Sequence, residues 1–228
     1  MTKLSMTQPD MQPDLDAALQ QLFAATRELL STDSATAEPF LSALPQSPFF
    51  RQTPEGEADL PVCRFWPHCL ESASDKSNPD RPAVARIAAA LRLLTPSLRW
   101  RQNPNYRQSP PSENFLANYG YAELCGSYGL IEAEIRFGVL ILGPGTCYPS
   151  HRHPAEEIYV PLGRGEWQRG EADVEADRWV EQPAGQVIHH PPFVPHATRG
   201  LQQPLAALYL WRGDLATEAK LDSTPAQV

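Results

Sequence analysis

A short segment of this chain carries a concentration of side chains that bind metals. Five of the six histidines fall between residues 151 and 196. His151 and His153 are separated by one residue, and Glu157 follows four residues after His153. Because alternate residues of an extended strand share a face, both histidines point the same way, and a turn at Pro154–Ala155 brings the glutamate to them. Two imidazoles and a carboxylate suit a divalent metal such as Fe, Mn, Co, Ni or Zn, and His196 is the expected fourth ligand.

Two tyrosines flank these ligands. Tyr159 lies two residues after Glu157, so it is expected to share the ligand face of the same strand. Tyr148 lies three residues before the first histidine and is expected at the mouth of the site. A phenol has a pKa of about 10 in water, and a nearby divalent cation favours the phenolate, which can then act as a base. The alternative for Tyr159 is that it only packs against a ligand or forms a hydrogen bond to it.

Four further aromatic residues lie on predicted strands near these ligands. If they face inward, they form an apolar, electron-rich pocket that favours an organic cation. The alternative for each of them is ordinary packing in the core. The four residues are Trp167, Trp179, Tyr209 and Trp211.

The composition narrows the class of protein. The chain has 228 residues and a formal net charge of −8, which argues against nucleic acid or an anionic membrane as the main partner. No apolar stretch approaches the roughly 20 residues that span a bilayer. The first residues, MTKLSMTQPDMQPD, lack the apolar region of a signal peptide. We therefore expect a cytoplasmic protein.

The four cysteines do not predict a disulfide framework in a chain of this kind. Cys63 and Cys69 together with His68 could be a second metal site, but their spacing matches no common zinc pattern. Ordinary thiols are the favoured interpretation of both, as of Cys125. Cys147 lies inside the metal-binding segment, so its oxidation is expected to affect that site.

The pattern of apolar residues divides the chain into three parts. Residues 1–12 are expected to be disordered. Residues 13–117 are expected to form a helical and irregular N-terminal extension, with amphipathic helices at 13–30 and 82–94 and a short helix at 37–44. Residues 118–228 are expected to form a β-barrel, because short apolar runs alternate there with Gly and Pro turns. The predicted strands are 121–125, 130–142, 148–153, 156–162, 165–169, 178–182, 186–190 and 205–212.

The segment GTCYPSHRHPAEEIYVPLG resembles the first cupin motif, G-x5-H-x-H-x3/4-E-x6-G. Gly145 stands at the required distance before the first histidine, whereas Gly163 comes one residue early. The second motif, P-x-G-x2-H-x3-N, is half present. Pro191 and its histidine keep their spacing, but Phe193 replaces the glycine and Gly200 replaces the asparagine. This resemblance implies a mainly β fold, the cupin jelly-roll barrel, with the helical segment as an N-terminal extension.

Within the cupins, the H-x-H-x3-E-x-Y pattern and the helical leader resemble the bacterial dimethylsulfoniopropionate lyases. The segment NYGYAELCGSYGLIEAEIRFGVLILGPGTCYPSHRHPAEEIY resembles their DddL branch most, and the specific motifs lie in residues 118–200. Those carbon–sulfur lyases split dimethylsulfoniopropionate into dimethyl sulfide and acrylate. The resemblance implies one divalent metal per protomer, a small zwitterionic sulfonium substrate, and a tyrosinate that removes the α-proton. The ligands it implies are His151, His153, Glu157 and His196, and the candidate bases are Tyr159 and Tyr148.

Two other classes of function remain open at this stage. One is a different cupin metalloenzyme, such as a dioxygenase or an isomerase. The other is a non-enzymatic cupin that senses a metal or a small molecule. Because cupins often pair through their strands, a homodimer is the expected assembly.

Overall fold

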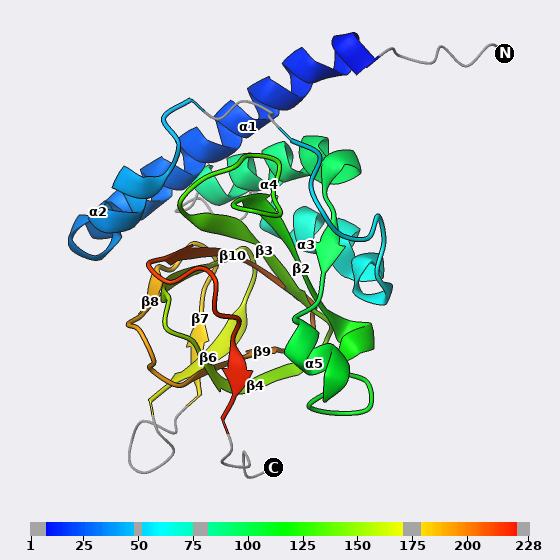
Figure 1. Ribbon diagram of the computed structural model, residues 1–228, viewed down its shortest axis with the longest axis vertical. Coiled ribbons are helices and arrows are strands. Elements are labelled where there is room, and N and C mark those ends of the chain that lie inside the picture. Colours follow the sequence, from blue (N-terminus) through cyan, green and yellow to red (C-terminus); the bar gives the residue numbers. More distant parts are fainter. Residues whose placement is uncertain (1–7, 48–51, 75–81, 171–178, 223–228) are drawn as a thin grey trace, which may run out of the picture.

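The computed structural model describes residues 8–47, 52–74, 82–170 and 179–222, and its helices precede most of its strands (Figure 1). Short 3-10 turns occupy Ser31–Asp33, Pro61–Phe65, Thr95–Ser97 and Leu116–Asn118. The α-helices are α1 (Gln8–Leu30), α2 (Ser34–Ala43), α3 (Trp66–Ala73), α4 (Pro82–Leu94) and α5 (Pro104–Gln108).

The strands form two antiparallel sheets. One has six strands in the order β1-β2-β3-β10-β5-β8, and the other has five in the order β11-β4-β9-β6-β7. From β3 to β10 the chain passes back and forth between the two sheets, which is the jelly-roll arrangement expected for a cupin. The strands are β1 (Trp100–Arg101), β2 (Tyr119–Cys125), β3 (Arg136–Leu142), β4 (Cys147–Arg152), β5 (Glu156–Pro161), β6 (Gly165–Arg169), β7 (Val180–Gln182), β8 (Ile188–His190), β9 (His196–Gly200), β10 (Leu205–Arg212) and β11 (Lys220–Leu221).

The expected fold class, mainly β with an N-terminal helical region, is confirmed, and several bounds differ from those predicted. Helix α1 begins at Gln8, so it includes part of the segment expected to be disordered, and residues 1–7 lie outside the described part. Strand β3 begins only at Arg136, because residues 126–131 turn back onto β2 through backbone hydrogen bonds. The sequence patterns did not predict α3, α5, β1, β9 or β11. No helix among the described residues has the length and apolarity that crossing a membrane requires.

Helices α1, α2, α3 and α4 cover the face of the six-stranded sheet that points away from the other sheet, whereas α5 lies near β4 (Figure 1). Helices α1 and α4 pack side by side, and their apolar stripes join one core with the outer face of the sheet. In that core the ring of Phe23 meets Phe137 edge to face, with 5.3 Å between centroids. This burial explains why the helical segment and the sheet fold as one body.

Strand alternation gives the six-stranded sheet two unlike faces. In β10, Ala206, Leu208 and Leu210 join the core under the helices. The residues between them, such as Tyr209 and Trp211, belong to a second buried cluster between the two sheets. That second cluster is rich in aromatic rings and surrounds the predicted metal ligands.

A segment that we call the C-terminal strap, residues 213–222, crosses the space between the sheets. Its β11 pairs with β4, opposite His151 and Arg152. The carbonyl of Ala219 accepts hydrogen bonds from the side-chain amides of Asn103 and Asn105, at 2.9 and 3.0 Å. The strap is therefore fixed both to β4 and to the segment that leads into β2.

Candidate active site

The four predicted ligands meet between the two sheets. His151 in β4 lies directly opposite His196 in β9, and His153 begins the turn into β5. One nitrogen from each of the three imidazoles lies within 4.8 Å of the other two. Glu157 reaches the same point from β5, where its Oε2 lies 3.1 Å from the Nε2 atoms of both His153 and His196. All four residues are buried.

The backbone sets the orientation of each ligand imidazole. In every case Nδ1 lies within hydrogen-bond distance of a carbonyl two residues away, so Nδ1 carries the proton and donates it. Each neutral ring then presents the lone pair of Nε2 to the centre of the site. The three bonds are His151 to Pro149 at 2.9 Å, His153 to Ala155 at 3.0 Å and His196 to Val194 at 2.9 Å.

This arrangement fits a divalent metal. With Nδ1 as the donor, Nε2 of His153 is an acceptor, yet it faces the carboxylate oxygen of Glu157, which is also an acceptor. A cation between two such acceptors would account for their 3.1 Å separation, because ligand atoms at about 2.1 Å from one ion are separated by about 3 Å when they subtend a right angle. Nε2 of His151 and of His196 also have no hydrogen-bond partner among the described residues. These residues could therefore hold a metal ion.

The electrostatics agree with that assignment. Burial, reinforced by the neighbouring histidines, holds the pKa of His151 well below its usual value. Burial alone would raise the pKa of Glu157, but its interactions with the adjacent imidazoles of His153 and His196 outweigh burial, and the pKa lies well below the usual value. A neutral imidazole and an ionised carboxylate are the forms that bind a metal.

An aromatic ring lies against each of the three ligand histidines. These stacked rings limit the rotation of the imidazoles and exclude water from them. The pairs are Tyr148 on His151 at 3.9 Å and 7°, Trp211 on His153 at 4.0 Å and 29°, and His190 on His196 at 4.1 Å and 11°.

Two of these rings also fix neighbouring oxygens. The indole nitrogen of Trp211 donates a 2.6 Å hydrogen bond to Oε1 of Glu157, which leaves Oε2 for the site. The hydroxyl of Tyr148 lies 3.0 Å from that of Tyr106, a buried residue of α5. The ligand carboxylate and one candidate base are therefore both held in place by aromatic neighbours.

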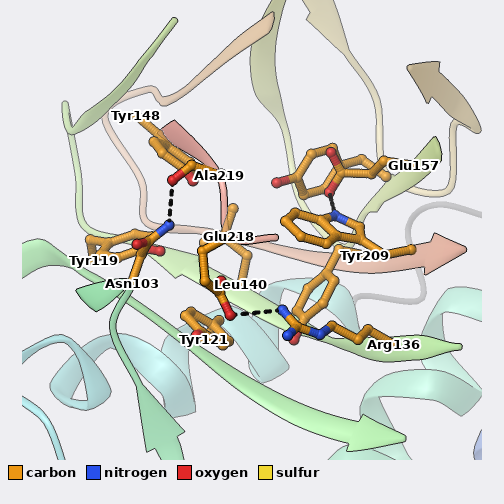
Figure 2. Close-up of a pocket in the computed structure, with 12 residues that line it drawn as sticks. Asn103, Tyr119, Tyr121, Arg136, Leu140, Tyr148, Glu157, Tyr209, Glu218 and Ala219 are labelled. Atoms are coloured by element: carbon orange, nitrogen blue, oxygen red, sulfur yellow. Dashed lines mark hydrogen bonds and ion pairs between the residues drawn. The ribbon is translucent and has the colours of Figure 1, made fainter. Parts of the chain in front are cut away.

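A cavity of about 410 Å³, counted to its opening into solvent, lies beside the ligands (Figure 2). The rim nearest the ligands is lined by Tyr148, Glu157, Tyr159 and Trp211. The remaining wall includes Tyr119, Tyr121, Arg136, Tyr209 and Glu218.

Both candidate bases line this cavity, and both are buried. Burial raises the pKa of Tyr159 well above its usual value, and the nearby Glu157 carboxylate raises it further. Burial and two neighbouring phenols likewise raise the pKa of Tyr148. The cationic charge of a metal at the ligand site would act in the opposite direction.

The structure separates the four aromatic residues predicted to bind substrate. Tyr209 and Trp211 line the cavity. Trp167 belongs to the same buried cluster, but it lies behind Tyr159, with 6.2 Å between ring centroids, and is not part of the lining. The ring of Trp179 packs against the guanidinium of Arg199 at 4.3 Å and is not part of the lining of this cavity.

Arg136 and Glu218 are cavity residues that the sequence analysis missed. Arg136 opens β3 with its side chain directed between the sheets, and Glu218 belongs to the C-terminal strap. Strand alternation along β3 could have predicted that Arg136 points between the sheets, because the apolar Phe137, Val139 and Ile141 all face the helices. No local sequence pattern predicts that Glu218 lines the cavity.

The second cluster of candidate metal ligands does not form a site in the described residues. All four cysteines are free thiols, as expected. The sulfur of Cys63 accepts a hydrogen bond from the backbone of Leu60, and Cys69 is buried in the helical core. Burial raises the pKa of Cys63 to about 11 and that of Cys69 to about 12, which favours the neutral thiol over a metal-binding thiolate.

Comparison with known proteins identifies the family. Residues 36–207 match the family model described as dimethylsulfoniopropionate lyase. The chain is 33% identical to dimethylsulfoniopropionate lyase DddQ of Ruegeria pomeroyi over 207 residues, which cover 89% of this chain and 92% of that enzyme. The crystal structure of DddQ from the same organism superposes with a TM-score of 0.62 at 29% identity, covering 90% of this chain and 99% of the other.

A second crystal structure, from work on the DMSP lyases RdDddP and RnDddQII, superposes with a TM-score of 0.67 at 28% identity over 91% of this chain and 98% of the other. The curated relative is a DddQ enzyme, whereas the sequence segment had been compared with the DddL branch. The family match spans most of the chain, and the identity to DddQ extends over nearly its full length. This chain therefore belongs to the dimethylsulfoniopropionate lyase family.

Proposed function

We propose that this protein is a metal-dependent carbon–sulfur lyase that cleaves dimethylsulfoniopropionate into dimethyl sulfide and acrylate. The observation that carries the proposal is the cavity shared by Glu157 and two tyrosines, beside three imidazoles whose lone pairs converge. Membership of the dimethylsulfoniopropionate lyase family supports the same substrate. A site of this kind combines a cation position, a potential base and a dry aromatic wall, which is what a base-catalysed β-elimination requires.

The residues of the chain have separable roles in this reaction. A bound divalent metal supplies Lewis-acid polarisation of the substrate carboxylate, which acidifies the adjacent C–H. We assign the phenolate oxygen of Tyr159 as the acceptor of that proton. The electron pair of the broken C–H bond forms the carbon–carbon double bond, and the C–S bonding pair leaves with sulfur. The products are acrylate, neutral dimethyl sulfide and a protonated tyrosine, so atoms and charge balance.

Tyr159 is the better candidate for the base, and Tyr148 for positioning. Tyr159 follows Glu157 on the ligand face of β5. The hydroxyl of Tyr148 is already shared with Tyr106, and its ring stacks on His151. Because burial raises the pKa of Tyr159, little phenolate is present at neutral pH unless a cation opposes the shift. The phenolate fraction grows with pH, so the rate should rise with pH.

The metal and the assembly are part of the same proposal. The expected occupancy is one divalent transition metal per protomer, held by His151, His153, Glu157 and His196. Nitrogen and oxygen ligands of this type accept Fe, Mn, Co, Ni or Zn. We further propose a cytoplasmic homodimer in which residues 13–117 form the N-terminal extension and residues 118–228 the cupin domain.

The direct test is to incubate the purified, metal-loaded protein with dimethylsulfoniopropionate and to measure dimethyl sulfide in the headspace by gas chromatography. Acrylate should appear in the solution in equal amount. The same protein treated with a chelator is the control and should be inactive until metal is restored. Oxygen consumption without dimethyl sulfide would instead indicate a different cupin metalloenzyme, and metal binding without turnover would indicate a sensor.

A further inference from the structure

The wall of the cavity away from the ligand histidines carries a cluster of charged groups. Arg136 and Glu218 both line the cavity, and the guanidinium Nη1 lies 3.0 Å from Oε1 of Glu218. Behind them the buried carboxylate of Glu123 lies 3.8 Å from Nε of Arg136. One guanidinium therefore faces two carboxylates. With both carboxylates ionised the cluster has a net charge of −1, although burial raises the pKa of Glu123. A neighbouring ion pair between Arg101 and Glu55, at 3.8 Å, leaves this net charge unchanged, because it adds one positive and one negative charge.

Buried polar atoms in this cluster lack partners in the part of the chain that the structure describes. Oε2 of Glu123 and Nε of Arg136 form no hydrogen bond there. The hydroxyl of Tyr209 is also unpaired, although the residue is only 7% exposed and lines the cavity. An uncompensated negative charge is costly when buried, and a cation in the cavity would reduce that cost.

This charged cluster lies two strands away from the proposed ligand Glu157 in the six-stranded sheet. Arg136, Trp211 and Glu157 lie directly opposite one another on β3, β10 and β5. Two strand spacings of about 4.8 Å place the backbone of Arg136 about 10 Å from that of Glu157. Figure 2 shows Tyr209 between Glu157 and Arg136, with Glu218 reaching toward Arg136 from the strap. The cavity between them is bounded by a metal site on one side and an excess negative charge on the other.

The wall between these two sites suits a methylated cation. Tyr121 and Tyr209 meet edge to face with 6.1 Å between centroids, and Trp211 also lines the cavity, with the guanidinium carbon of Arg136 5.7 Å from its ring centroid. A methylated sulfonium or ammonium has no N–H or O–H to donate, so it is recognised by ring faces and by net charge rather than by hydrogen bonds. Among the residues that the structure describes, Glu218 is the only carboxylate in the cavity lining apart from the proposed ligand Glu157.

We propose that Glu218, held by Arg136 and backed by Glu123, recognises the cationic end of the substrate. The cavity then selects a zwitterion, with its carboxylate toward the ligand histidines and its onium group toward Glu218. Arg136 is a positioning residue that fixes the carboxylate of Glu218 and keeps the excess charge to one unit. This inference rests on the proposed function for the identity of the zwitterion, and the mode of recognition is a separate claim.

Two isosteric probes test the inference without relying on turnover. The first is 3-(trimethylammonio)propanoate, and the second is 4,4-dimethylpentanoate, in which a neutral carbon replaces the charged nitrogen. Isothermal titration calorimetry on the metal-loaded protein gives the affinity for each probe. The wild-type protein should bind the cationic probe about tenfold or more tightly than the neutral one. Equal affinities in the wild type would overturn the proposal, whatever any variant does.

The variant Glu218→Gln removes the charge while its amide oxygen can still accept from Arg136. Its affinity for the cationic probe should fall about tenfold, and its affinity for the neutral probe should change less than about twofold. Glu218→Asp should keep most of the preference, because the charge is retained. The matched control is Glu181→Gln, which removes a carboxylate paired with Arg164 outside the cavity and should change neither affinity.

The outcomes separate recognition from catalysis. If Glu218→Gln weakens both probes equally, or neither, Glu218 does not recognise the cation and the proposal is wrong. Circular dichroism melting of each variant shows whether it is folded. If Glu218→Gln is unfolded, the proposal is decided by the affinities of the wild-type protein and of Glu218→Asp for the two probes. A protein that prefers the cationic probe but releases no dimethyl sulfide would contradict the proposed function alone. A protein that releases dimethyl sulfide without that preference would contradict this inference alone.

Discussion

The two faces of the six-stranded sheet differ, although the same strands build both. The outer face, under α1 and α4, is aliphatic, with residues such as Val139, Val160 and Leu208. The inner face carries tyrosines, tryptophans and the proposed metal ligand Glu157. Along β5 the change occurs at every residue, from Glu157 to Ile158 to Tyr159. The sheet thus separates the side chains that hold the fold together from those that do chemistry.

The difference shows how a small enzyme tolerates an unfavourable interior. The space that the inner face lines contains buried polar atoms without partners in the described residues, among them Nε2 of His151, from the opposite sheet, and the hydroxyl of Tyr209. Such atoms destabilise a fold until a ligand or metal satisfies them. Burial of apolar side chains under the helices offsets this cost, because each fully buried aliphatic residue contributes about 1.5–3 kcal/mol. Substitutions on the two faces should therefore have different consequences.

The largest effect is expected for the ligands on the inner side. His153→Ala or His196→Ala should remove the metal and abolish turnover, while the β-rich circular dichroism spectrum persists. Elemental analysis of the purified variants measures the metal. His189→Ala is the control, because His189 bonds to Glu156 and is not part of the ligand group. Full metal content in both ligand variants would contradict the assignment and make His190 the next candidate.

The next effect is expected for the tyrosines. Tyr159→Phe should lower kcat by about 10²–10⁴-fold, the usual contribution of a general base, with the metal retained and KM little changed. Tyr148→Phe should act mainly on KM, since its hydroxyl is tied to Tyr106. Tyr128→Phe, outside the cavity lining, should leave both constants unchanged. Near wild-type kcat in both cavity variants would require a different base.

On the outer face the expected effect is on stability alone. Leu91 and Leu93 lie on the same helix, α4, but Leu91 is buried in the core between the helices and the sheet, whereas Leu93 is 60% exposed. Leu91→Ala should lower the free energy of unfolding by about 2–5 kcal/mol, and Leu93→Ala by less than about 0.5 kcal/mol. Urea denaturation measures both. A loss of kcat in folded Leu91→Ala as large as that of Tyr159→Phe would remove the distinction between the faces.

The smallest effect is expected at Phe193, which stands where the second cupin motif has glycine. Its backbone has a φ of 64°, and its side chain is 61% exposed. A left-handed conformation costs a residue with a Cβ roughly 1–2 kcal/mol, and little apolar burial compensates here. Phe193→Gly should therefore raise the free energy of unfolding by up to about 1 kcal/mol. Phe193→Ala keeps the strain, so it should show no such gain in thermal melting.

The meeting of three of the four proposed ligands could be predicted from the sequence, because these three are close together and follow strand alternation. His151, His153 and Glu157 occupy seven consecutive positions, so local geometry nearly determines their arrangement. The same holds for Tyr159. The motif departure at Phe193 did not disturb the turn, because the backbone adopts the conformation of glycine with a different residue.

The remaining wall of the cavity could not be predicted, because its residues meet only through the tertiary fold. Arg136 and Glu218 are 82 residues apart, and no local pattern pairs them. Trp179 lies next to a strand, as expected, but the pairing of β7 with β6 decides which face it occupies. The missed strand β9 follows a loop rich in proline, whose composition hides the five residues His196–Gly200 that pair with β4 and β6.

The ligands are distributed over both sheets, and this has a mechanical consequence. His151 and His196 belong to the five-stranded sheet, whereas Glu157 belongs to the six-stranded sheet. One ion bound by all of them would act as a cross-link between the two layers. By thermodynamic linkage, its binding energy would then also oppose separation of the sheets. Metal supply would in that way set how long the enzyme survives in the cell, as well as how fast it works.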